Sequence, residues 1–224
     1  MQEKVLLLIL DGFGINRSDT GNAIAAARMP AYKKFLQTAL QGELKTCGKD
    51  VGLPADTMGN SEVGHLNIGA GRIVYQLNTM IDSKIETGDF FSNPALLKAI
   101  IHCQKYNSNL HLCGLLSDGN VHSFNQHLYA LLDFCDRNSM KRVYLHAFMD
   151  GRDTPPDSGL DFIKEYEEKA VQLGIGKIVS VSGRYYAMDR DKRWDRVELA
   201  YQAMVYGKGE RFPQADLAVS SSYQ

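Results

Sequence analysis

The sequence predicts an α/β fold in which helices cover a parallel β-sheet. From about residue 77 onward, helical patterns alternate with short apolar or β-branched runs, which is typical of strand–helix–strand units. The segment 4–10 is apolar on both faces, as expected of a central strand in a parallel sheet. Hydrophobic residues make up 44% of the 224 residues and charged residues 23%, which is the composition of a globular protein with a core.

The N-terminal part, residues 1–75, is expected to form one region. Its strand at 4–10 is followed by a sharp turn at 11–14. A helix begins near Asn22 and is interrupted at Pro30, which can open the next helix as its first residue. A glycine-rich passage then runs from 48 to 71, and a long passage of this kind is more often a functional loop than filler.

The remaining part, residues 76–224, is expected to form a second domain, and we place the boundary near 72–76. Asn93 and Pro94 form a capped helix start, and Ser123 is expected to cap another helix. The predicted helices cover residues 77–86, 94–105, 124–137, 158–173 and 187–206, and the predicted strands cover 110–116, 142–148 and 177–181.

Charge and cysteine content narrow the possible function. The 25 Lys and Arg residues nearly balance the 26 Asp and Glu residues, so there is no general electrostatic case for binding nucleic acid or an anionic membrane. The apolar run at 5–10 is too short for a membrane span or a signal-peptide core. The four cysteines are widely spaced, and we expect them to be reduced and structural, with Cys113 and Cys135 packed in apolar segments. We therefore expect a cytoplasmic protein.

Three predicted strands end in the same dipeptide, Asp-Gly, at Asp11, Asp118 and Asp150. The carboxyl ends of parallel strands face the ligand crevice, so carboxylates there are well placed for a metal or a polar substrate. The alternative for each is ordinary turn chemistry, since Asp-Gly is a common turn sequence.

Ser61 lies in the glycine-rich passage and precedes a possible short helix at 62–68. A hydroxyl at a helix N-terminus lies near unpaired backbone N–H groups and the positive end of the helix dipole, which suit a transferring phosphate. The alternative is that Ser61 is only the N-cap of that helix. As a nucleophile, Ser61 would need a base or a metal, and Asp11 could hold that metal.

Arginines gather between residues 184 and 196. Arg184 and Arg190 precede or open the predicted helix there, where a guanidinium can bind a carboxylate or phosphate through two hydrogen bonds. Arg193 and Arg196 are interpreted as part of a solvated helix face. The residues Trp194, Val197, Tyr201 and Met204 recur at helical spacing and are expected to form its buried stripe.

Two further loops follow strand ends. One carries Arg152 and Asp153, and the other presents His122 four residues after Asp118. That spacing could suggest metal ligands, but the intervening glycine and the expected helix cap favour a loop that presents a single histidine.

Taken together, four segments resemble cofactor-independent (2,3-bisphosphoglycerate-independent) phosphoglycerate mutase, a family of the alkaline phosphatase superfamily. The resemblance runs from residue 6 to the last residues. The segments are the strand end Asp11-Gly12, Met58-Gly-Asn-Ser61-Glu-Val-Gly-His65, Asp150-Gly-Arg152-Asp153-Thr-Pro-Pro156 and Ser182-Gly-Arg184-Tyr-Tyr-Ala-Met-Asp-Arg190.

The resemblance implies a two-domain architecture and a set of site residues. Residues 1–75 would be the first segment of an alkaline-phosphatase-like, metal-binding α/β domain, and residues 76–224 a substrate-binding transferase domain inserted into it. Two divalent metal ions are implied, with manganese expected, and Asp11 and Ser61 would both ligate one of them. Ser61 would be the nucleophile that becomes phosphoserine. The implied substrate-binding residues are His122, Arg152, Asp153, Arg184 and Arg190.

The implied reaction is the interconversion of 3-phosphoglycerate and 2-phosphoglycerate in glycolysis and gluconeogenesis, which makes the enzyme an isomerase. Ser61 takes the phosphoryl group from one hydroxyl of the glycerate, which reorients without leaving and takes the group back on its other hydroxyl. The arginines must serve both orientations of this small acid. A monomer is expected when the protein is complete.

The family's phosphatase domain continues after the inserted domain and supplies further metal ligands and cations that have no match in this sequence. Two metal ions held by Asp11 and Ser61 alone would lack most of their ligands. We therefore expect an N-terminal fragment, with an incomplete second domain, that is inactive alone. Two alternatives remain: a related metal-dependent phosphomutase or phosphatase, and a non-catalytic fragment that binds phosphoglycerate.

Overall fold

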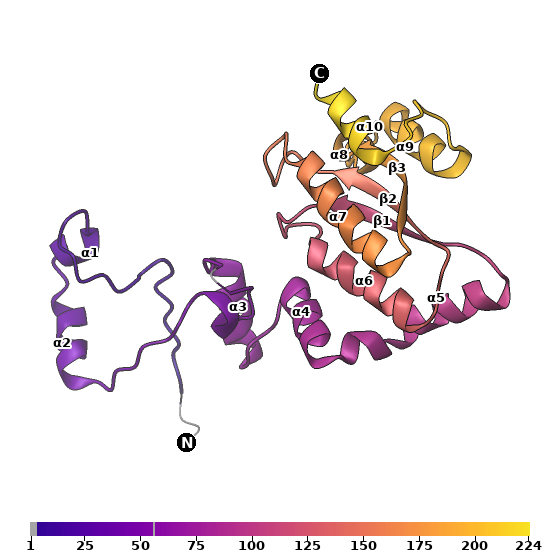
Figure 1. Ribbon diagram of the computed structural model, residues 1–224. Coiled ribbons are helices and arrows are strands. Elements are labelled where there is room, and N and C mark those ends of the chain that lie inside the picture. The colour runs from indigo at the N-terminus through magenta and orange to yellow at the C-terminus, as the bar shows by residue number, and fades with distance from the viewer. Residues whose placement is uncertain (1–3, 56) are drawn as a thin grey trace. The chain divides into compact units, whose positions relative to one another are not determined.

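The computed structural model describes residues 4–55 and 57–224 (Figure 1). The chain divides into two compact units, Met1–Met80 and Ile81–Gln224. The division falls within helix α4 (Leu77–Thr87), slightly beyond the boundary expected from sequence. In the described part of the chain, no helix is long and apolar enough to span a membrane.

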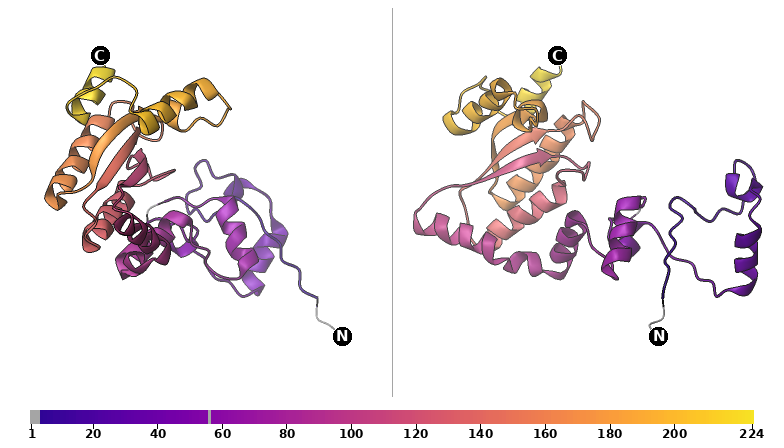
Figure 2. Two further views of the ribbon diagram at one scale, coloured as in Figure 1. Left: turned by 90° about the vertical axis from the view of Figure 1, so that its right-hand side faces the viewer. Right: turned by 180° about the vertical axis from the view of Figure 1, so that it is seen from behind.

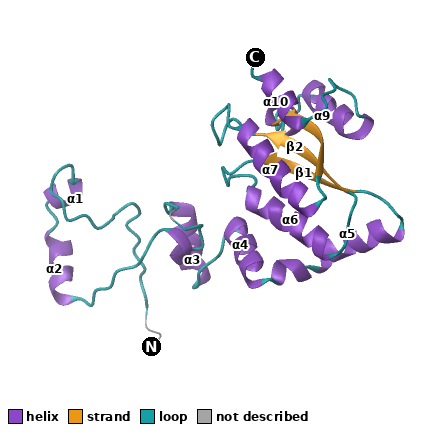
Figure 3. Ribbon diagram, viewed as in Figure 1, coloured by secondary structure: helices purple, strands orange, loops and turns teal. Residues whose placement is uncertain are grey.

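The first unit contains short helices joined by long loops (Figure 3). Its elements are α1 (Ala23–Ala26), α2 (Pro30–Thr38), the 3-10 helix η1 (Gly48–Val51) and α3 (Ser61–Ala70). Asn22 caps α1 by accepting a hydrogen bond from the Ala25 amide, and Pro30 is the first residue of α2, as predicted.

The predicted strand at 4–10 is wrong. Residues 4–10 form no strand, and the side chains of Val5, Leu6 and Leu8 are 92%, 88% and 75% exposed. A strand needs hydrogen-bonding neighbours, and the strands of the described residues pair only with one another. The apolar pattern alone therefore does not make a strand of this segment, because no strand of the described residues pairs with it.

The glycine-rich passage folds around a small core formed by Val51, Leu53 and Val63. Asn67 ties its ends together, because its side-chain amide donates to the Val51 carbonyl at 3.0 Å and its side-chain oxygen accepts from the Val74 amide at 2.7 Å. Gly52 has a φ of +82°, and a Cβ there would lie 2.2 Å from the Val74 carbonyl oxygen. This close approach excludes any larger residue at that position.

The second unit is built on a three-stranded parallel sheet in the order β1-β2-β3. The strands are β1 (Leu110–Leu116), β2 (Val143–Met149) and β3 (Lys177–Gly183), close to their predicted bounds. This confirms the α/β class and the parallel sheet. Helices α6 (Asn125–Arg137) and α7 (Gly159–Leu173) lie in front of the sheet in Figure 1, whereas the strands face the viewer when the molecule is seen from behind (Figure 2, right).

The core of this unit lies between the sheet and those helices. Its largest fully buried side chains include Tyr166, Phe134, Leu116, Leu132 and Leu145. The cysteines are free thiols, but only Cys103 and Cys135 are buried. The expectation that Cys113 packs as a buried residue is wrong, because Cys113 is exposed on β1, whereas its neighbour Leu112 packs against the core.

Among the other described helices of the second unit, the one at Pro94–Lys105 has its predicted bounds, whereas the rest differ from the prediction. These other helices are η2 (Asp89–Ser92), α5 (Pro94–Lys105), α8 (Arg184–Ala187), α9 (Trp194–Tyr206) and α10 (Ala215–Ser222). The N-cap of α6 is Phe124 rather than Ser123, and α10 has no counterpart in the prediction.

The helix expected at 187–206 begins only at Trp194, and residues 188–193 separate it from α8, which ends at Ala187. Lys192 has a φ of +60°, which a helix does not allow, and the carboxylate of Asp189 accepts from the Arg193 amide at 2.8 Å just before α9 begins. The expected buried stripe is wrong at Trp194 and Tyr201, which are 69% and 50% exposed, whereas Val197 and Met204 are half-buried.

Candidate functional site

Ser61 is the first residue of α3, and Asn60 is its N-cap. The backbone of Asn60 is extended, and its side-chain oxygen accepts from the Val63 amide at 2.9 Å. The alternative in which Ser61 serves only as an N-cap is therefore wrong. Because Asn60 does the capping, the Ser61 hydroxyl is available for another interaction.

The Ser61 hydroxyl donates a hydrogen bond to the Asp11 carboxylate, with Oγ and Oδ2 2.7 Å apart. The turn predicted at 11–14 places Asp11. The Phe13 amide donates to the Leu10 carbonyl at 3.1 Å, and Gly12 has a φ of +73°, which favours glycine. The structure thus brings together two residues that the sequence analysis assigned to one metal, although they are 50 positions apart.

His65 is a third member of this cluster, and the sequence analysis gave it no role. Its Nδ1 lies 2.8 Å from the Ser61 carbonyl oxygen and 3.2 Å from Ser61 Oγ. A carbonyl oxygen can only accept, so Nδ1 carries the proton and cannot also accept one from the hydroxyl. Asp11, rather than His65, is therefore the hydrogen-bond acceptor for the nucleophile candidate. The separation of four residues on a helix is the sequence signal for this pair.

Asp11 and Ser61 fit as two oxygen ligands of one divalent ion, because a carboxylate and a hydroxyl that already converge form the donor set that Mg²⁺ or Mn²⁺ prefers. Among the described residues there is no group of three or more His, Cys, Asp or Glu that could hold a metal. The ligands needed to complete such a site are therefore not within the described part of the chain.

A second cluster forms in the second unit, where the ends of the parallel strands meet. Arg184 is the first residue of α8 and directly follows β3. Its Nη1 lies 2.6 Å from Asp150 Oδ1 and 2.6 Å from Asp153 Oδ2. The hydrogen bonds to both carboxylates raise the pKa of Arg184, so the guanidinium remains charged.

Asp150 follows β2 and is the most buried carboxylate of this cluster, with 2% of its side chain exposed. Ser117 donates to its Oδ2 at 2.7 Å, and the amides of Arg152 and Asp153 donate to its Oδ1 at 3.1 and 3.0 Å. Burial by itself raises the pKa of Asp150, but the hydrogen bonds from Ser117, Asp153, Arg184 and Arg152 outweigh it and lower that pKa to about 2. Asp150 is therefore ionised at neutral pH.

The loops that follow β1 and β2 approach each other closely at Gly119. A Cβ at Gly119 would lie 3.1 Å from the Cβ of Asp153, so a larger residue would push the two loops apart. The same loop carries His122, whose Nε2 lies 4.0 Å from Asp153 Oδ2. Of the expected substrate residues, the structure thus joins His122, Asp153 and Arg184. Arg152 and Arg190 are exposed, and no hydrogen bond ties their side chains to this cluster within the described residues.

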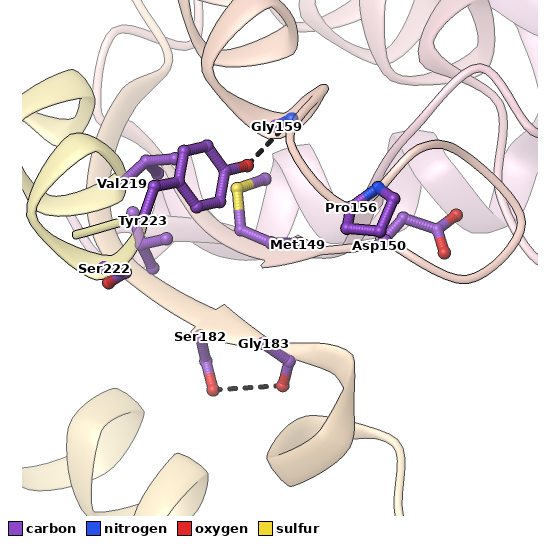
Figure 4. A pocket seen from close by; sticks show the side chains of 11 residues that line it. Met149, Asp150, Pro156, Gly159, Ser182, Gly183, Val219, Ser222 and Tyr223 are labelled. Atoms are coloured by element: carbon purple, nitrogen blue, oxygen red, sulfur yellow. Dashed lines mark hydrogen bonds between the residues drawn. The ribbon is translucent and has the colours of Figure 1, made fainter.

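Asp150 also borders a cavity of about 230 Å³ near the start of α7. The cavity is lined largely by backbone and apolar groups such as Met149 and Val219, and the Tyr223 hydroxyl accepts from the Gly159 amide at 3.1 Å. Figure 4 shows the carboxylate of Asp150 pointing away from the Tyr223 ring. The cavity therefore lies beside the charged cluster.

The chain is similar in sequence and in fold to known proteins. Residues 81–224 match the family described as the N-terminus of BPG-independent phosphoglycerate mutase. The chain is 55% identical over 225 aligned residues to 2,3-bisphosphoglycerate-independent phosphoglycerate mutase of Acetivibrio thermocellus, and 53% identical over 222 to that of Clostridium perfringens. A crystal structure of Leishmania mexicana phosphoglycerate mutase at low cobalt concentration matches 95% of this chain and 40% of its own, with a TM-score of 0.69 and 34% identity.

These matches define an α/β protein of the phosphoglycerate mutase class. The chain belongs to the BPG-independent phosphoglycerate mutase family. It spans 44% of the length of the Acetivibrio thermocellus relative and 43% of the Clostridium perfringens relative.

Proposed function

We propose that this chain is the N-terminal part of a mutase that interconverts 3-phosphoglycerate and 2-phosphoglycerate through a phosphoserine at Ser61. The observation that carries the proposal is the 2.7 Å hydrogen bond from Ser61 to Asp11 at the start of a helix. The names of the relatives support the same reaction. In this proposal the first unit supplies the nucleophile and the second unit binds the glycerate.

In the first unit, the Asp11 carboxylate accepts a hydrogen bond from the Ser61 hydroxyl and so orients it. The N-terminus of α3 adds the positive end of a helix dipole beside Ser61, which stabilises negative charge on a phosphoryl group. A divalent ion bound by Asp11 and Ser61, which we propose to be manganese, would lower the pKa of the serine hydroxyl. A second ion would need ligands beyond the described residues.

In the second unit, Arg184, Arg152, Arg190 and His122 are proposed to bind the two anionic groups of the glycerate. Phosphoryl transfer depends mainly on positioning and on neutralisation of charge, which guanidinium groups supply. Several cations allow the acid to be held in both of the orientations that the reaction needs. Free thiols at all four cysteines support a reducing compartment, and we propose the cytoplasm.

The test is to trap the phosphorylated serine. A hybrid enzyme joining residues 1–224 to the rest of the Acetivibrio thermocellus relative is incubated with 3-phosphoglycerate and Mn²⁺. We expect turnover in an enolase-coupled assay and a phosphate on the peptide that contains Ser61, detected by mass spectrometry. Ser61→Ala should remove the phosphate and lower kcat by about a thousandfold or more.

Ser83→Ala is the matched control, because Ser83 is exposed on α4 and is expected to leave both readouts unchanged. Wild-type turnover by the Ser61→Ala enzyme would show that Ser61 is not the nucleophile.

A second candidate function applies to the 224 residues as they stand. The described residues offer only part of a metal site, which favours binding of phosphoglycerate without turnover. Calorimetry of the 224-residue chain with 3-phosphoglycerate should then show binding that does not depend on manganese. Robust turnover by this chain alone in the enolase-coupled assay would refute the second candidate.

A further inference from the structure

Asp150 meets four hydrogen-bond donors from three parts of the second unit. Ser117 lies at the end of β1, the Arg152 and Asp153 amides belong to the loop after β2, and Arg184 follows β3. Three of these donors share Oδ1 and Ser117 bonds Oδ2, so both oxygens of the carboxylate are hydrogen-bonded. The residue that follows each of the three strands is therefore either Asp150 itself or a residue hydrogen-bonded to its carboxylate.

We propose that Asp150 is a positioning residue. Its hydrogen bonds hold Arg184 and the 150–153 loop in the orientation that binds the glycerate substrate. This inference rests on the function proposed above for the second unit. Asp150 itself does not contact the substrate, because both of its oxygens are already bonded and its side chain is 2% exposed. A negatively charged substrate would also be repelled by it.

The orientation of the Arg184 guanidinium depends on the buried charge of Asp150. All hydrogen bonds of its guanidinium within the described residues pass through Nη1, which is shared by Asp150 and Asp153. Asp153 is the more exposed partner, at 19%, and also faces His122. Because Nη1 is held by both carboxylates, the remaining N–H groups of the guanidinium have a fixed direction, and a rigid donor loses less entropy when it binds an anion.

Asp150→Asn removes the negative charge at this position and keeps nearly the same side-chain shape. Asparagine has nearly the same size and keeps one oxygen for the donors at Oδ1, while its NH₂ group can donate to Ser117 Oγ. The hydrogen bond to Arg184 then loses its negative partner, and charge-assisted bonds are about twice as strong as neutral ones. Asp161→Asn is the matched control, because Asp161 is an exposed carboxylate in the first turn of α7.

The experiment uses NMR on the ¹⁵N-labelled 224-residue chain. The side-chain N–H signals of Arg184 report how firmly the guanidinium is held, and amide shifts during titration with 3-phosphoglycerate give Kd. We expect Asp150→Asn to remove the restricted Arg184 signals and to raise Kd by about fivefold or more, with other amide shifts unchanged. Ser117→Ala should do the same to a smaller extent, and Asp161→Asn should do neither.

A double-mutant cycle tests whether Asp150 acts through Arg184. In an Arg184→Gln background, we expect Asp150→Asn to change Kd by less than about twofold, since residues that act as one unit are not additive. An equal rise in Kd in both backgrounds would overturn the inference, as would wild-type Kd and Arg184 signals in Asp150→Asn.

The experiment also distinguishes a failure of this inference from a failure of the proposed substrate binding. If the unaltered chain shows no shifts with 3-phosphoglycerate, the proposed substrate binding fails, and the Arg184 signals still decide whether Asp150 holds the guanidinium. If Asp150→Asn does not fold, Ser117→Ala carries the same comparisons. Arg184 signals in Ser117→Ala that match the wild type would then overturn the inference.

Discussion

Asn60 and Ser61 are adjacent polar residues with different roles. Asn60 caps the N-terminus of α3, and the Ser61 hydroxyl is therefore free to donate a hydrogen bond to Asp11. A serine that capped its own helix would have its oxygen committed to a backbone amide. The arrangement therefore depends on a second capping residue directly before the nucleophile candidate.

The capping role of Asn60 predicts a measurable loss of local stability. Asn60→Ala should destabilise α3 by about 1 kcal/mol, because the Val63 amide loses its partner. The measurement is amide hydrogen exchange of residues 61–70. Asn60→Asp should restore the protection, since aspartate is an equally good N-cap. Equal exchange rates in Asn60→Ala and the unaltered chain would contradict the assignment.

The sequence predicts which residues of the candidate site lie close together better than it predicts which of them are buried. Asp11 and Ser61 were expected to share a site, and they are in contact. Asp150 belongs to the recurring Asp-Gly strand ends, but sequence alone could not distinguish its buried carboxylate from the exposed one of Asp118. The difference in burial depends on which hydrogen-bond donors of the neighbouring loops surround each carboxylate. Those loops come together only when the strands pair.

At the scale of elements, the strands and helices with strong periodicity or clear caps were predicted well. α5, which begins at Pro94 after the Asn93 cap, has its predicted bounds. The errors have physical causes. The break before α9 rests on the left-handed Lys192, a residue type with no preference for that conformation, and residues 4–10 lack neighbouring strands in the described part of the chain.

A histidine pair connects the strands on the sheet face opposite to α6 and α7. His111 Nδ1 on β1 lies 2.9 Å from His146 Nε2 on β2, and His146 Nδ1 lies 2.7 Å from Ser180 Oγ on β3. Burial of His146, together with the nearby His111, lowers the pKa of His146. His146 is therefore held in its neutral form.

This pair predicts a loss of stability in mild acid. A lowered folded-state pKa contributes stability that is present above the unfolded pKa of about 6.5 and is lost as the pH falls through the folded-state value. His146→Gln, which cannot be protonated, should make the free energy of unfolding depend less on pH between about 7.5 and 5.5. The measurement is urea unfolding at several pH values.

His102→Gln is the control, because His102 is exposed on α5 and does not belong to the histidine pair. The assignment would be wrong if the two variants showed the same pH dependence of unfolding.

At the scale of the whole molecule, the hydrophobic cores of the two units are very different. In the described residues, the core of the first unit consists of Val51, Leu53 and Val63, whereas the second unit buries a large cluster between sheet and helices. Burial of apolar surface is the main source of folding free energy. The second unit therefore has the means to fold by itself.

A shortened chain of residues 76–224 should unfold cooperatively with heat. Its Tm should lie within about 4 °C of the transition of the full chain, because a change of about 1 kcal/mol shifts a unit of this size by no more than that. Residues 1–75 alone should show no cooperative transition. The measurement is circular dichroism during heating, and a broad, non-cooperative melt of 76–224 would contradict this expectation.

The order of the sheet has a consequence for synthesis on the ribosome. Because the strands lie in the order β1-β2-β3, each strand joins the sheet beside the strand made just before it, and none has to enter between two others. Chains whose contacts are near in sequence fold faster, and domains can fold while they are being made. The regular pairing of β1 with β2 can therefore form first. The register shift between Leu145 and His146 then arises only when β3 arrives.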